Sequence, residues 1–137
     1  MSGSVPGGAF AQVTTLQAAA VAAGAAVGAL LRWCAGLLLN SLWAGFPLGT
    51  LLVNCLGGLL IGVAMVWFAR SPHEVLRLLL VTGVLGGFTT FSSFSAESLG
   101  LLQRGEPGLA LLHSAAHLLG ALACTAVGYM LARIVLR

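Results

Sequence analysis

The chain has 137 residues, of which 59% are hydrophobic and 7% charged, and its formal net charge is +3. A soluble domain carries about a quarter charged residues, so this composition excludes water as the main solvent and predicts an all-α membrane protein. Four spans of about 20 residues use nearly the whole chain, so we expect no catalytic domain and no enzymatic activity. The charge comes from scattered arginines, which excludes a basic stripe for nucleic acid.

Residues 1–14 carry no positive charge, so we predict a disordered tail rather than a secretory signal. Residues 15–137 are predicted to form one four-helix transmembrane domain. Its spans cover about 16–39, 48–68, 75–102 and 109–131, and the protein is expected to be a multi-pass protein of the cell (inner) membrane. Trp43 and Phe46, between the first two spans, are expected at the lipid interface.

Five polar side chains fall inside these apolar spans. A polar group in a bilayer is costly unless it has a partner or a watery path. These residues are Arg32, Asn54, Glu97, His113 and His117.

The third span is predicted to be broken at mid-membrane, because three glycines (Gly83, Gly86 and Gly87) precede the hydroxyl-rich run 89–95. Unwound backbone at membrane depth needs protein or an ion to satisfy its polar groups. The half-helix before a break offers carbonyls to a cation, and the one after it offers N–H groups to an anion. A glycine kink that only eases packing is the alternative.

Two aromatic residues follow the break on one helix face, since Phe91 and Phe94 are three apart. Aromatic edges carry positive electrostatic character and can contact a small anion. Asn54 can add an N–H donor. The alternative for both phenylalanines is packing against lipid or the core.

Three motifs occur in order along the chain. They are Gly28-Ala29-Leu30-Leu31-Arg32, Gly49-Thr50-Leu51-Leu52-Val53-Asn54-Cys55-Leu56-Gly57 and Gly86-Gly87-Phe88-Thr89-Thr90-Phe91-Ser92-Ser93-Phe94-Ser95. Together they resemble the CrcB/Fluc family of fluoride channels, and the resemblance spans all four helices.

The resemblance implies a fluoride-selective channel that exports cytoplasmic fluoride passively and confers fluoride resistance. It implies an antiparallel, dual-topology homodimer with two fluoride pathways. Asn54, Phe91 and Phe94 would line each pathway, and we place Thr90 and Ser93 on the same route. The main-chain carbonyls of two further residues, Gly86 and Thr89, would hold one structural Na+ at the dimer interface.

The fourth helix departs from the family pattern of a tyrosine and hydroxyl residues, because the corresponding stripe carries His113 and His117. Neutral histidine can donate to fluoride, so we assign both to the pathway. Packed or interfacial histidines are the alternative, and a metal site lacks an apparent third ligand. Arg32 and Glu97 are assigned to the charge of the vestibule, with helix-end packing as the alternative for Arg32.

Three alternatives remain open on sequence grounds. The partner could be an oppositely oriented paralogue rather than a second copy, because the arginines gather on one side of the predicted topology. A four-helix proton-coupled exporter of the small multidrug type is a second alternative, although no acid precedes Glu74. A non-conducting membrane subunit is the third.

Overall fold

The structure, a computed structural model, describes residues 13–43 and 45–137. Four helical segments are long and apolar enough to cross a membrane: Thr15–Leu39, Leu48–Arg70, Glu74–Gln103 and Pro107–Val135. The prediction of an all-helical chain with four membrane-spanning helices is therefore confirmed. Most of the predicted tail lies outside the described residues. Thr14, its last residue, caps the first helix through hydrogen bonds exchanged with Gln17.

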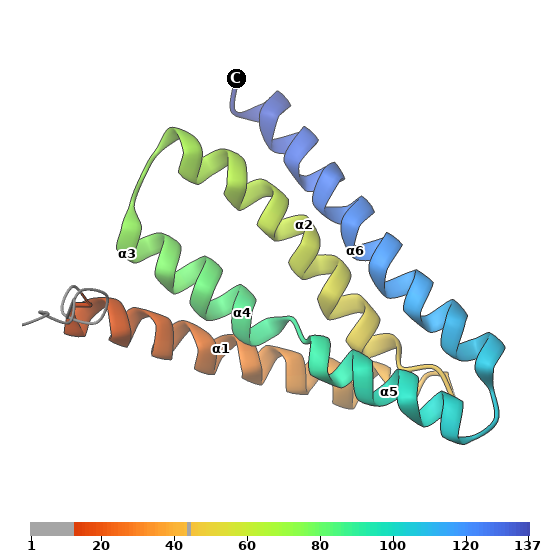
Figure 1. Cartoon of the computed structure of the whole chain (residues 1–137). Coiled ribbons are helices and arrows are strands. Elements are labelled where there is room, and N and C mark those ends of the chain that lie inside the picture. Colours follow the sequence, from red (N-terminus) through yellow and green to blue (C-terminus); the bar gives the residue numbers. More distant parts are fainter. Residues whose placement is uncertain (1–12, 44) are drawn as a thin grey trace, which may run out of the picture.

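The first two spans and the last are each a single helix, labelled α1 (Thr15–Leu39), α2 (Leu48–Arg70) and α6 (Pro107–Val135). The third span is divided. It begins as α3 (Glu74–Arg77), continues as the π-helical segment η2 (Leu78–Leu85) and the short α4 (Gly86–Phe88), and resumes as α5 (Phe91–Gln103). Figure 1 shows α5 separated from α4 by a stretch without helical turns.

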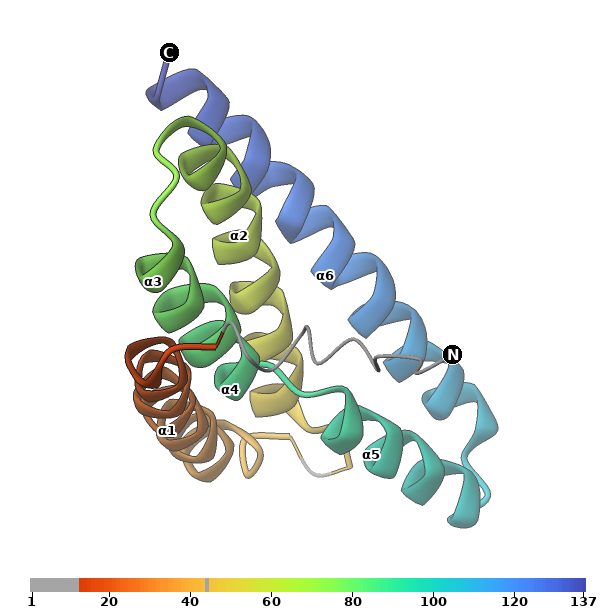
Figure 2. The same cartoon turned by 60° about the vertical axis from the view of Figure 1, so that its left-hand side comes forward.

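Small residues bring α1 against the first half of the third span. A Cβ atom at Gly24 would lie 2.9 Å from the Val84 nitrogen, and one at Gly28 would lie 2.7 Å from the Phe88 nitrogen. These backbones therefore approach each other as closely as small-residue motifs allow in lipid. In Figure 2 this pair of segments forms one arm of the molecule.

The second arm pairs α2 with α6 in the same way. A Cβ atom at Gly58 would lie 2.6 Å from the Ala121 carbonyl oxygen, and one at Gly62 would lie 2.7 Å from the Tyr129 nitrogen. The glycine pairs of α1 and α2 thus serve packing within the chain. In Figures 1 and 2 the two arms diverge toward the C-terminus, and α5 leans away from α4 toward the start of α6.

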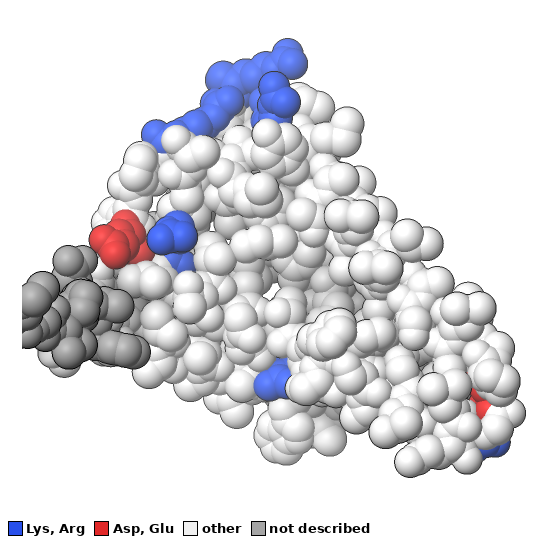
Figure 3. Space-filling model, in the orientation of Figure 1, with Lys and Arg blue, Asp and Glu red and all other residues white. Residues whose placement is uncertain are grey.

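Most arginines lie toward one end of the molecule. Arg70 ends α2 and Arg133 lies in the last turn of α6, and Figure 3 shows blue side chains gathered where these two helices end. At the opposite end, Arg104 pairs with Glu106 at 3.0 Å. The membrane-spanning body between the ends is nearly free of charged side chains on the face that Figure 3 shows.

Candidate functional site

The third span loses its helical conformation at two threonines between α4 and α5. Thr89 (φ −81°, ψ 157°) and Thr90 (φ −153°, ψ 116°) are both extended. The Thr90 hydroxyl then accepts a hydrogen bond of 3.1 Å from the Ser93 N–H and so caps α5. Thr89 thus ends one helix, and Thr90 starts the next as N-cap preferences predict.

Asn54 of α2 holds this interruption with both ends of its side-chain amide. Its Oδ1 accepts from the Thr90 N–H at 2.9 Å, and its Nδ2 donates to the Thr90 carbonyl at 3.1 Å. An unpaired backbone group in a membrane costs several kcal/mol. The two contacts with Asn54 satisfy both the N–H and the carbonyl of Thr90. Among residues 13–43 and 45–137, only one of the two Nδ2 hydrogens is used, which leaves one donor of Asn54 available.

The same contacts redirect two amides from their helical acceptors. In a continuous helix the Thr90 and Ser93 N–H groups would donate to the carbonyls of Gly86 and Thr89, four residues earlier. Here those amides donate to Asn54 Oδ1 and Thr90 Oγ1 instead. The carbonyls of Gly86 and Thr89 are therefore available for another ligand, and both residues line an open hollow of about 850 Å³.

Phe91 and Phe94 share one face of α5, as predicted, and their ring centroids lie 5.2 Å apart. Phe91 is 78% exposed in the single chain. Phe94 is half-buried, and its ring lies 5.4 Å from that of His113 and 4.9 Å from that of His117. The predicted aromatic and histidine positions thus form one continuous cluster.

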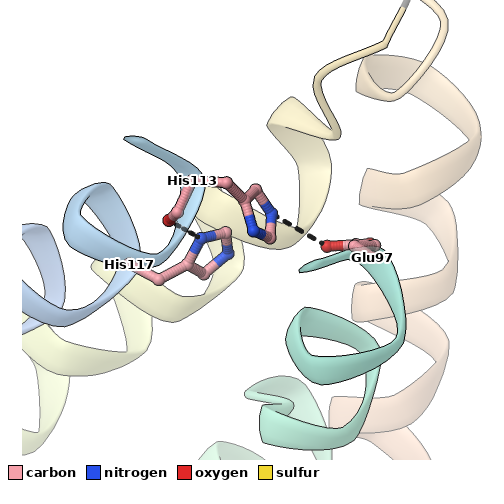
Figure 4. A group of neighbouring side chains, drawn as sticks. All are labelled: Glu97, His113 and His117. Carbon is pink, nitrogen blue, oxygen red and sulfur yellow. Dashed lines mark hydrogen bonds and ion pairs between the residues drawn. The ribbon is translucent and has the colours of Figure 1, made fainter. Parts of the chain in front are cut away.

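Both histidines of α6 are buried, and they meet a carboxylate from α5. His113 is 0% exposed and His117 is 5% exposed. The His113 Nε2 lies 3.3 Å from Glu97 Oε2, while Glu97 Oε1 accepts a hydrogen bond of 2.5 Å from Thr50. Figure 4 shows the two imidazoles and the carboxylate converging between the helices.

A second hollow of about 500 Å³ borders this cluster at Glu97 and Thr50. Arg32, Glu97, Thr90 and Ser93 all contribute to its lining. Arg32 is half-buried and makes no ion pair with a carboxylate among the residues that the structure describes. The guanidinium charge is therefore free to act on the hollow that it borders.

Three contributors to the site were not predicted from the sequence. Thr50 orients Glu97, and the Ser98 hydroxyl lies 2.9 Å from His113 Nδ1. Phe46 was expected at the lipid interface, and that expectation was wrong: it is 5% exposed and packs edge-on against His113 at 5.3 Å. Thr50 lies in the second motif, but nothing in its spacing identifies a carboxylate 47 residues away as its partner.

These features define a small multi-pass membrane protein with an interrupted helix and a buried polar cluster. The family model described as CrcB-like protein, Camphor Resistance (CrcB), matches residues 19–129. The chain belongs to this family.

Curated relatives agree with this assignment. A protein named fluoride-specific ion channel FluC from Aromatoleum aromaticum is 55% identical over 112 residues, which cover 80% of this chain and 86% of the relative. Proteins of the same name from Pseudomonas aeruginosa and Bordetella petrii are 52% and 54% identical over 111 residues. Each alignment covers 80% of this chain, and it covers 87% of the first relative and 85% of the second.

Proposed function

We propose that this chain is a fluoride-selective channel of the inner membrane, through which cytoplasmic fluoride leaves passively down its electrochemical gradient and which thereby confers fluoride resistance. The interruption at Thr89 and Thr90 carries this proposal, because it places the free N–H groups of a helix start directly beside Phe91 and Phe94. The relatives named as fluoride channels support the same function.

The pathway that we propose runs along α5 and α6 at the middle of the membrane. Fluoride is strongly hydrated, so its water must be replaced by contacts that are favourable without trapping the ion. Asn54 retains one N–H donor, and Phe91 and Phe94 offer ring edges. Hydroxyl groups continue the route at Thr90 and Ser93, and the rings of His113 and His117 border it.

Arg32 and Glu97 set the charge at the mouth of this route. They border the same hollow, which also reaches Thr90 and Ser93. An unpaired guanidinium in a cleft with low-dielectric walls raises the local concentration of anions. Glu97, held by Thr50, opposes that attraction close to the pathway and so helps to prevent trapping.

The functional unit that we propose is an antiparallel, dual-topology homodimer. Phe91 is 78% exposed, Leu118 70% and Leu122 64%, and all three line the larger hollow. A second copy placed over this hollow would cover these side chains and complete both pathways. An oppositely oriented paralogue could occupy the same surface, and co-purification of differently tagged copies of this chain distinguishes the two.

A structural Na+ fits the carbonyls that the interruption frees. Hard cations prefer oxygen ligands, and the Gly86 and Thr89 carbonyls have lost their helical donors to side chains. Two such carbonyls from each copy would give four oxygen ligands across a two-fold axis. The ion would join the subunits and would not be transported.

Neither a proton-coupled exporter nor a non-conducting membrane subunit is supported. The relatives are named as channels rather than enzymes or exporters, and α1 contains no carboxylate that could exchange a proton for a cation.

The test is fluoride efflux from liposomes that contain only this purified chain, followed with a fluoride electrode after addition of a potassium ionophore. We expect fluoride release without chloride release. Absence of release from protein that is folded and dimeric would contradict a self-sufficient channel. Release only after addition of a second, related chain would identify a paired heterodimer.

A further inference from the structure

Glu97, His113 and His117 form a cluster whose geometry is that of a metal site. A ligand atom from each side chain lies within 4.8 Å of those from the other two. The histidines are four residues apart on α6 and therefore share one face, while Glu97 approaches from α5 (Figure 4). The sequence lacked a third ligand for these histidines, and the packing of α5 on α6 supplies one.

The orientation of His117 leaves a lone pair pointing into the cluster. Its Nδ1 lies 3.0 Å from the His113 carbonyl oxygen. A carbonyl only accepts hydrogen bonds, so Nδ1 carries the proton and Nε2 presents its lone pair. That Nε2 is buried, and it has no hydrogen-bond partner in residues 13–43 and 45–137.

The other two ligands are held in the same way. His113 Nδ1 is engaged by the Ser98 hydroxyl at 2.9 Å, and Glu97 Oε1 is engaged by Thr50. This leaves His113 Nε2 and Glu97 Oε2, which are 3.3 Å apart but not aligned for a hydrogen bond, and neither has another partner in the part of the chain described. In each side chain, one polar atom is thus held by a hydrogen bond and the other is free to bind a metal. Metal ligands are commonly oriented by outer hydrogen bonds in this way.

We propose that Glu97, His113 and His117 bind a divalent transition-metal ion, with Zn²⁺ as the best-fitting ion. Two imidazole nitrogens and one carboxylate oxygen are a known zinc ligand set with a fourth position open. With bonds of about 2.0–2.1 Å in tetrahedral geometry, neighbouring ligand atoms lie about 3.3 Å apart. The distance from His113 Nε2 to Glu97 Oε2 already has this value. A small movement of the His117 side chain toward these two atoms completes the site.

The chemistry of the location also favours a cation. An unpaired carboxylate inside a membrane is costly, and neutral imidazoles add no positive charge to compensate it. A divalent ion pairs with the carboxylate and uses both free nitrogens at once. This proposal concerns metal binding and stands independently of whether fluoride passes through the protein.

The test is direct metal binding to the purified full chain in detergent, after removal of any polyhistidine tag. Equilibrium dialysis against Zn²⁺ is expected to give one saturable site per chain. His113→Gln and His117→Gln are each expected to weaken binding by at least about tenfold. His73→Gln is the matched control, because His73 is exposed in a loop where its Nδ1 only caps the start of α3, and this variant should bind normally.

The Co²⁺-substituted protein provides the second measurement, which needs no variant to fold. We expect a tetrahedral ligand-field spectrum without a thiolate charge-transfer band. A thiolate band would assign the metal to the cysteines and overturn the proposal. No saturable binding by the folded protein, or equal binding by both histidine variants and the control, would overturn it as well.

Discussion

Replacing Asn54 by leucine tests how the interruption of the third span is held. The substitution keeps the branched shape of the side chain but removes two hydrogen bonds of 2.9 and 3.1 Å to the Thr90 backbone. Thr90 is only 8% exposed, so water does not replace them. Hydrogen bonds between membrane helices contribute about 0.6–1.7 kcal/mol each, and a buried unsatisfied group costs about 1–3 kcal/mol. We therefore expect the backbone around Thr90 to lose about 2–3 kcal/mol of local stability.

The measurement is amide hydrogen exchange across residues 86–95 in lipid nanodiscs. A loss of 2–3 kcal/mol corresponds to exchange of the Thr90 amide that is roughly 30- to 150-fold faster. Asn40→Leu is the matched control, since Asn40 is exposed and accepts a single hydrogen bond from the Gly49 N–H. This variant should lose less than about 1 kcal/mol of local stability. Unchanged protection of Thr90 would refute the reasoning, because the freed amide would then have returned to the Gly86 carbonyl and closed the interruption.

Two further variants address the pathway and the packing. Phe94→Ile removes the ring that lies against both histidines, so fluoride efflux from liposomes should be abolished while the dimer persists on gel filtration. Phe68→Ile, which removes a ring at the end of α2, is the control. Equal efflux from the two variants would exclude an aromatic pathway. Gly128→Ala places a Cβ against the Leu59 main chain and should destabilise the folded protein by at least about 2 kcal/mol in a reversible SDS titration. Gly108→Ala, whose Cβ meets nothing within 4 Å, is its control, and equal stability of the two would contradict close packing of α2 on α6.

The four spans could be predicted because each is an apolar run of sufficient length bounded by polar connectors. The position of the interruption was also readable, since glycines followed by hydroxyl residues disfavour a continuous helix. The π-helical register of η2 was not predicted, because apolar periodicity does not distinguish hydrogen bonds to the fourth residue from bonds to the fifth. The segment Leu78–Leu85 packs against α1, and the periodicity of its own sequence does not specify that contact.

The site residues could be selected from the sequence, but their partners could not. Polar side chains in apolar spans are few, so Asn54, Glu97 and the two histidines stood out. The contact of Asn54 with Thr90 joins residues 36 apart, and that of Thr50 with Glu97 joins residues 47 apart. Such pairs depend on the angle between helices, which the sequence pattern does not specify.

The close packing of α2 on α6 has a consequence for the synthesis of the protein in the membrane. α2 is made early and α6 last, so the glycine face of α2 at Gly58 and Gly62 must remain uncovered in the membrane while the third span is synthesised. Contacts between segments far apart in sequence form late, and exposed helix faces invite wrong partners. A nascent chain released before residue 107 would present that face to other membrane proteins, because the helix that covers it would be absent.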